Sequence, residues 1–194
     1  MRLFAFLQMF ALLGVALLAA PASQAQISSQ RLTLCASCHG ADGNSQLKGI
    51  PSLAAQPKLF LENSLVLIRE GMRVIPEMKG MLDGVSDTEI TELAKYYAAL
   101  PLAAPPSDRD AVVFARGGKL AEGMRCGICH LPDYLGRDQI PRLAGQREDY
   151  LLHSMLQFKN NQATGRDSNM AASVYGVSDQ DLQDISYFLA RLKQ

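Results

Sequence analysis

The sequence predicts an all-α protein built from two tandem domains of similar design. Three observations lead to this prediction. The pattern Cys-x-x-Cys-His occurs twice, other segments recur in the same order in both halves, and no alternating apolar pattern of useful length indicates a β-strand. Apolar residues at helical spacing occur in both halves instead.

The internal repeat extends well beyond the two cysteine motifs. Residues 50–56 match residues 140–146 at an offset of 90, and residues 84–87 match residues 176–179 at an offset of 92. Small insertions account for the drift between the two offsets. Two copies, each with its own Cys-x-x-Cys-His motif, indicate tandem domains rather than a solenoid.

The repeat and a proline-rich segment define the expected domain organisation. We predict an N-terminal domain at residues 26–100 and a C-terminal domain at residues 109–194, joined by a linker at residues 101–108. The prolines of the linker stop the preceding helix and favour an extended, stiff path.

Four helices are predicted from apolar spacing and from end signals. Ser86 with Glu89 forms a capping box, and Ser178 with Asp181 forms a weaker one with aspartate in the third position. Helices are therefore expected from these caps to about Leu100 and Leu192. The other two are expected between Pro57 and Gly71, and at about residues 148–160.

The two motifs use every cysteine of the chain, and each is followed directly by a histidine: Cys35, Cys38 and His39, then Cys126, Cys129 and His130. Cys-x-x-Cys-His is typical of c-type haem attachment. Thiols at this spacing share one helical turn and can form thioethers with the two vinyl groups of a haem, and the histidine then lies under the iron. A redox disulfide or a four-cysteine zinc site is the alternative, but neither requires the histidine.

The N-terminal segment predicts export. An apolar stretch at residues 3–20 follows Arg2 and is succeeded by Ser23 and Ala25, so residues 1–25 are expected to be a signal peptide cleaved after Ala25. An uncleaved membrane anchor is the alternative. Export predicts the periplasm, an oxidising compartment in which thioether bonding would protect the thiols from disulfide formation.

Composition argues against nucleic-acid binding and indicates that the two domains need a cofactor. The formal net charge is zero, and the chain has no basic block that would bind nucleic acid. The mature chain leaves only about 80 residues for each domain, a size at which side chains alone give a marginal core. Two covalently bound haem c groups would complete the two cores.

An electron-transfer haem needs a second axial ligand, and methionine is the usual partner of histidine. The repeat selects between the methionines, because Met78 maps onto Met170 at the offset of 92, whereas Met72 maps onto a threonine and Met81 onto a serine. Met78 and Met170 are therefore the predicted sixth ligands. Without the repeat, each would more simply fill a core.

Several segments resemble the dihaem class I cytochromes c of the cytochrome c4 type, over nearly all of the mature chain. They are residues 35–45, 53–56, 77–80, 116–124 and 143–146. The resemblance implies two tandem class I cytochrome c domains packed face to face, each wrapped around one haem. It also implies that Pro51 and Pro141 offer their carbonyl oxygens to the axial histidines, although each proline could simply shape a loop.

The predicted function is electron transport rather than catalysis. The resemblance implies a periplasmic carrier that takes electrons from the bc1 complex or a dehydrogenase and passes them to a terminal oxidase, with loose membrane association left open. One alternative is a dedicated cytochrome subunit of a periplasmic dehydrogenase or sulfur-oxidising complex. A dihaem peroxidase is disfavoured because both sites offer a methionine and such enzymes are larger.

Overall fold

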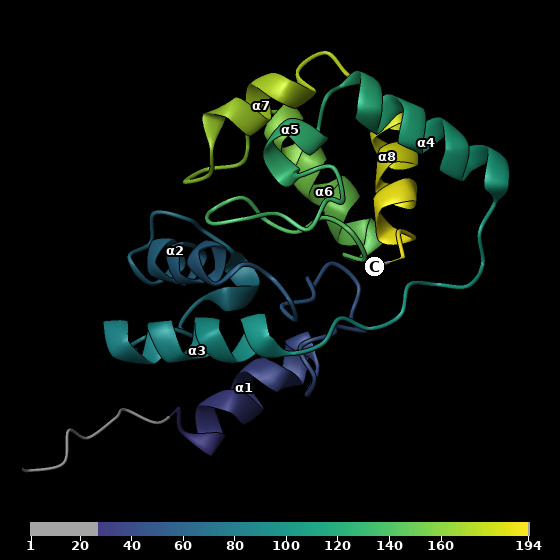
Figure 1. Ribbon diagram of the computed structural model, residues 1–194. Helices are drawn as coiled ribbons and strands as arrows, with labels where there is room; N and C mark the ends of the chain where they lie inside the picture. Colours follow the sequence, from purple (N-terminus) through teal and green to yellow (C-terminus); the bar gives the residue numbers. More distant parts are fainter. Residues whose placement is uncertain (1–26, 194) are drawn as a thin grey trace, which may run out of the picture.

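The computed structural model describes residues 27–193 of the 194-residue chain, so the predicted signal peptide at residues 1–25 lies outside the described residues. The described part is all-α, as predicted: it contains helices and one isolated bridge between Arg137 and Ile140, but no strand. In Figure 1 the first half (purple to teal) and the second half (green to yellow) form two stacked groups of helices.

The first half contains three α-helices and one 3₁₀ turn. In chain order they are α1 (Ser29–His39), α2 (Lys58–Arg69), η1 (Pro76–Met78) and α3 (Asp87–Ala99). Their buried apolar side chains form one core, which is made by Leu61, Leu82, Val85, Ile90, Leu93, Ala94 and Tyr97.

The second half repeats this order with five described helices. They are α4 (Ala111–Gly123), α5 (Gly127–His130), α6 (Glu148–Lys159), α7 (Ser168–Val174) and α8 (Asp179–Ala190). Its core is separate from the first and includes Leu151, Met155, Phe158, Leu182, Ile185 and Leu189. Each half therefore has its own hydrophobic core, as a separate domain does.

The serines of the two predicted capping boxes are confirmed as the N-caps of α3 and α8. The Ser86 hydroxyl accepts a hydrogen bond from the Glu89 N–H (3.2 Å), and the Ser178 hydroxyl accepts one from the Asp181 N–H (3.1 Å). These bonds satisfy amide groups that a helix leaves unpaired at its N-terminus. The helices end one or two residues before the predicted limits, at Ala99 and Ala190.

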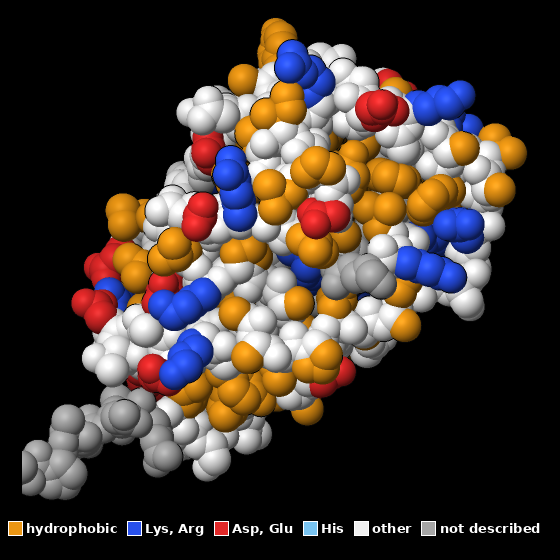
Figure 2. Space-filling model, viewed as in Figure 1, with side chains coloured by type: hydrophobic (Ala, Val, Ile, Leu, Met, Phe, Trp, Pro, Cys, Tyr) orange, Lys and Arg blue, Asp and Glu red, His pale blue; other side chains and the backbone are white. Residues whose placement is uncertain are grey.

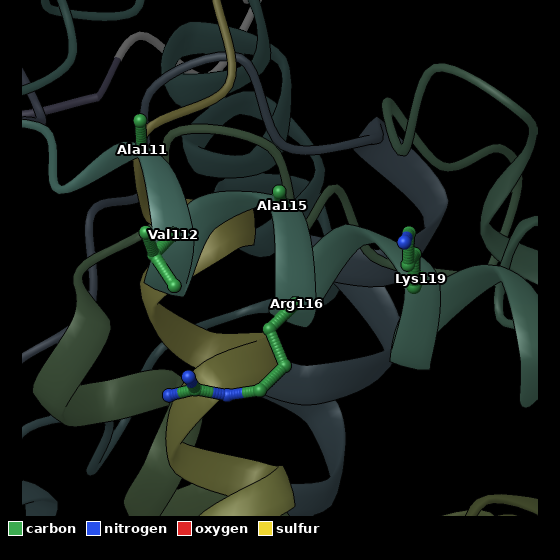
Figure 3. A pocket seen from close by; sticks show the side chains of 5 residues that line it. All are labelled: Ala111, Val112, Ala115, Arg116 and Lys119. Carbon is green, nitrogen blue, oxygen red and sulfur yellow. The ribbon is translucent and has the colours of Figure 1, made fainter.

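The first helix of each half is anchored differently. α4 packs along α8, and the Arg116 side chain of α4 extends across α8 (Figure 3). Arg116 forms an ion pair there with the buried Asp184. α1 is held to its half by Arg31, which donates to Glu89 (3.2 Å) and to the carbonyl oxygen of Met81 (2.7 Å). In the first half, these two polar contacts of Arg31 thus replace much of the helix packing that α4 makes with α8 in the second half.

The segment between α3 and α4 carries no helix and is tied to both halves. The Asn44 side chain donates to the Pro101 carbonyl (3.1 Å) and accepts from the Ala103 N–H (2.9 Å), whereas Arg191 donates to the Asp108 carbonyl (2.8 Å). It runs along one side of the molecule in Figure 1. The precise limits of the linker stay a prediction.

Among residues 27–193, no helix is both long and apolar enough to cross a membrane. On the face shown in Figure 2, lysine and arginine side chains are interspersed with aspartate and glutamate. This face carries no extended region of a single charge.

Candidate haem sites

The two cysteine motifs lie at the ends of helices in equivalent places. α1 runs without a break to His39, whereas the second motif lies in α5, which follows a turn at Arg125 with a φ of 59°. No disulfide joins any of the four cysteines, and within each motif the first is partly buried and the second is exposed. Burial raises the pKa of the Cys35 and Cys126 thiols, which favours the protonated form.

The alternative of a shared zinc site is not supported by the geometry. In the described part of the chain, no group of three or more histidine, cysteine, aspartate or glutamate side chains comes together as a metal site. The two pairs of cysteines belong to different halves of the molecule, so they do not form the four-cysteine cluster of a zinc ribbon.

His39 and His130 have the same environment. Each is 8% exposed, and burial lowers the pKa of both imidazoles. The Nδ1 atom of His39 lies 2.9 Å from the carbonyl oxygen of Pro51, and Nδ1 of His130 lies 2.8 Å from that of Pro141. Since a carbonyl can only accept, each ring carries its proton on Nδ1 and keeps the Nε2 lone pair for a metal.

The structure places Met78 and Met170 on short elements that sequence patterns did not predict. Met78 ends η1, and Met170 lies in α7, whose first turn is capped by the Asp167 side chain. Pro76 and Asp167 were the available signals, but both elements are too short for a periodic apolar pattern.

Burial distinguishes these methionines from Met72 and Met155. Met78 is partly buried against the same core as Cys35, and Met170 is partly buried against the same core as Cys126. Met72 is 51% exposed and Met155 lies inside the core of the second half. The assignment of Met78 and Met170 as axial ligands remains a proposal that this placement supports.

A pair of glutamines joins the two halves, and sequence analysis did not assign them a role. The Gln56 side chain accepts from the Arg142 N–H (3.0 Å) and donates to the Arg142 carbonyl (3.1 Å). Gln146, its equivalent in the repeat, accepts from the Ser52 N–H (2.8 Å) and donates to the Ser52 carbonyl (2.9 Å). The contact therefore has approximate two-fold symmetry.

Three arginines at this interface lack an acidic partner among the described residues. Arg142 is 1% exposed and its Nε has no hydrogen-bond partner, so desolvation lowers its pKa to about 10. Desolvation also lowers the pKa of Arg166 to about 10, and Arg73 from the other half repels it further. Buried cations are normally paired.

This donor set suits haem. Each half offers two thiols, a histidine with a free Nε2 and a methionine thioether, and the interface offers cations that match the carboxylates of haem propionates. The chemistry of the residues present therefore fits two haem c groups.

Comparison with known proteins identifies the family. The protein-family model for cytochrome c matches residues 114–193. The family model for cytochrome c oxidase, cbb3-type, subunit III matches residues 21–96. Cytochrome c4 from Pseudomonas aeruginosa is 32% identical over 189 residues, which cover 93% of this chain and 94% of the relative. The chain belongs to the cytochrome c4 family.

Two further relatives agree with this assignment. The crystal structure of reduced recombinant cytochrome c4 from Pseudomonas stutzeri superposes with a TM-score of 0.78 at 28% identity and covers 84% of this chain and 96% of that structure. A thiosulfate dehydrogenase electron acceptor from Thiomonas intermedia is 30% identical, covering 93% of this chain and 88% of the relative.

The predicted fold class and cofactors are confirmed by these matches. The protein consists of two cytochrome c domains, and two haem c groups are bound covalently through Cys35 with Cys38 and through Cys126 with Cys129. As a member of the cytochrome c4 family it is a dihaem electron carrier.

Proposed function

We propose that this protein is a periplasmic one-electron shuttle with two low-spin centres, His39/Met78 and His130/Met170. The observation that carries the proposal is the repetition of one arrangement in both halves: a buried histidine with its Nδ1 bound to a proline carbonyl, and a methionine on the same core as the first cysteine. Haem supplies the reversible one-electron chemistry of its iron.

The protein residues control that chemistry in three ways. The Pro51 and Pro141 carbonyls hold the imidazole rings in one orientation and make Nε2 more basic. The thioethers of Met78 and Met170 favour the softer ferrous state and raise the reduction potential. With a histidine and a methionine to hold the iron in each half, neither haem would offer a coordination position to peroxide, which disfavours the peroxidase alternative.

For donors and acceptors, we propose the bc1 complex or a dehydrogenase on one side and a terminal oxidase on the other. The mixed charges in Figure 2 favour docking with modest electrostatic steering, so the rate of electron transfer should fall only mildly with salt.

A second candidate is service as the dedicated acceptor of a periplasmic dehydrogenase. It is favoured by the similarity to the thiosulfate dehydrogenase electron acceptor of Thiomonas intermedia. This role uses the same two centres and differs only in the partner.

The experiment is a pair of stopped-flow measurements on the purified dihaem protein. Reduced protein mixed with membranes that contain a terminal oxidase should be reoxidised at a rate that saturates with oxidase concentration, and oxidised protein should be reduced by the bc1 complex. Fast reduction by a thiosulfate dehydrogenase, with slow reaction at the bc1 complex, would favour the second candidate. Turnover of hydrogen peroxide with a reduced donor would contradict both.

A further inference from the structure

One peptide group in each half connects the proposed axial histidine to the opposite half. The carbonyl of Pro51 accepts the proton of His39 Nδ1 (2.9 Å), while the N–H of the same peptide group, on Ser52, donates to Gln146 Oε1 (2.8 Å). Gln146 belongs to the other half. A hydrogen-bonded path therefore runs from the first histidine into the second domain.

The equivalent path starts at His130 in the second half and ends at Gln56 in the first half. The Pro141 carbonyl accepts from His130 Nδ1 (2.8 Å), and the N–H of that peptide group, on Arg142, donates to Gln56 Oε1 (3.0 Å). Each glutamine also donates through its Nε2 to the carbonyl of the residue it holds. This second bond fixes the rotation of the amide, so its oxygen points at the N–H.

The two glutamines and the residues whose N–H groups they bind are shielded from solvent, whereas Pro51 and Pro141 are partly buried. Gln56 is 4% exposed and Gln146 is 3% exposed, and Ser52 and Arg142 are 5% and 1% exposed. Hydrogen bonds in such surroundings are electrostatically stronger than bonds in water, and bonds in a chain polarise one another. Water cannot readily substitute for the glutamine acceptor.

The physical effect has a definite sign. An acceptor at the amide N–H increases the negative charge on the oxygen of the same peptide group, because the amide is a resonance system. That oxygen then binds the histidine Nδ1–H more strongly, and the ring becomes a more basic ligand. A more basic ligand stabilises ferric over ferrous iron and lowers the reduction potential.

We propose that Gln146 and Gln56 are positioning residues, each of which lowers the reduction potential of the haem in the opposite half. The proposal rests on the proposed roles of His39 and His130 as axial ligands. It makes each potential depend on the docking of the two domains, because the controlling side chain comes from the partner domain.

Gln146→Leu tests this directly in the intact dihaem protein. It removes the acceptor for the Ser52 N–H, so the potential of the His39 haem should rise while that of the His130 haem stays unchanged. The expected change is about twofold in the reduction equilibrium constant, or about 18 mV for a one-electron couple. Gln56→Leu should produce the mirror result. Spectroelectrochemical titration gives the potentials, and NMR of partly reduced protein assigns them to the halves.

Two further variants separate tuning from a general structural effect. Gln146→Glu keeps an acceptor oxygen in place, so it should not raise the potential of the His39 haem. Gln30→Leu, at an exposed position on α1, is the control and should change neither potential. The Nδ1 proton of His39 should shift in the NMR spectrum of the reduced Gln146→Leu protein towards the position of a weaker hydrogen bond.

Equal shifts of both potentials in Gln146→Leu, or no shift of either with an unmoved Nδ1 proton, would overturn the inference. In that case the shuttle function would still stand if both haems remained six-coordinate and delivered electrons to the oxidase. Failure of the wild-type protein to show two six-coordinate haems would instead overturn the proposed function.

Discussion

Gly117 of α4 lies directly against the backbone carbonyl of Asp184 in α8. A β-carbon at residue 117 would overlap the carbonyl oxygen of Asp184 and would stand 2.8 Å from the β-carbon of Phe188. The absence of a side chain at this position therefore lets the two helices cross at close range. The same crossing brings Arg116 to the buried carboxylate of Asp184.

Gly117→Ala should destabilise the second domain by about 3 kcal/mol or more, because the clash is with backbone that cannot move without separating the helices. Gly123→Ala in the same helix is the matched control, since nothing lies within 4 Å of its added β-carbon. That variant should be neutral or more stable by up to about 1 kcal/mol. Urea unfolding followed by circular dichroism measures both. Similar midpoints for the two variants would contradict the close helix crossing.

The Arg116–Asp184 pair predicts a specific acid sensitivity. The Arg116 guanidinium holds the pKa of the Asp184 carboxyl below its ordinary value. A carboxyl with a lowered folded pKa adds stability above its unfolded pKa, about 3.9, and that stability is lost as the pH falls through the folded pKa.

Asp184→Asn should therefore lower the free energy of unfolding by about 1 kcal/mol at pH 7, a modest value because Arg116 is partly exposed. Below about pH 4 the variant should lose less stability with falling pH than the wild type does. Urea midpoints measured from pH 7 to pH 3 provide the test. An acid profile as steep as that of the wild type would show that another group is responsible.

Replacement of the proposed axial methionines should have a spectroscopic effect confined to one haem. Met78→Ala or Met170→Ala should convert one centre to a high-spin or ligand-exchangeable form, because each change removes the thioether proposed as the sixth ligand of that haem. Absorption spectra of the oxidised protein should lose half of the sulfur-to-iron charge-transfer band. Met72→Ala, at a side chain that is 51% exposed, should leave the band intact. Retention of the full band in Met78→Ala would refute the ligand assignment.

The buried charge of Arg142 should raise the potential of at least one haem, because a nearby cation favours the reduced iron. Arg142→Met removes the charge and keeps an unbranched side chain. It should lower the reduction potential of at least one haem by about 40 mV, which corresponds to about 1 kcal/mol for a one-electron couple. Arg137→Met, on an exposed part of the same loop, should change the potentials little because water screens its charge. Equal effects of the two variants would argue against a special role for Arg142.

Each domain should depend on haem for stable folding. The two cores are small and separate, and His39 and His130 are buried with an unused ring nitrogen. Chain expressed without haem insertion should therefore lack the cooperative thermal transition of the holoprotein in circular dichroism. A similar transition in both forms would show that the side chains alone are sufficient.

Much of the fold could be predicted because its signals are local. Ser86 and Ser178 fix the starts of α3 and α8 through capping bonds within four residues, and the Cys-x-x-Cys-His motifs need only one helical turn to place two thiols and a histidine. The offset between Met78 and Met170 is likewise a property of the sequence alone. The short elements η1 and α7 escaped prediction because three to seven residues cannot show a helical period.

The sequence by itself determined the chemistry of each half: the attachment cysteines, the histidine, the candidate methionine and the duplication. Only the tertiary structure decided how the halves meet. Gln56 and Gln146 are ordinary polar residues in a loop, and nothing in their spacing indicates that each binds the backbone beside the histidine of the other domain. Hydrogen bonds between residues about 90 positions apart depend on the packing of two completed cores. For the same reason, the burial of Arg142 could not be read from its neighbours in the chain.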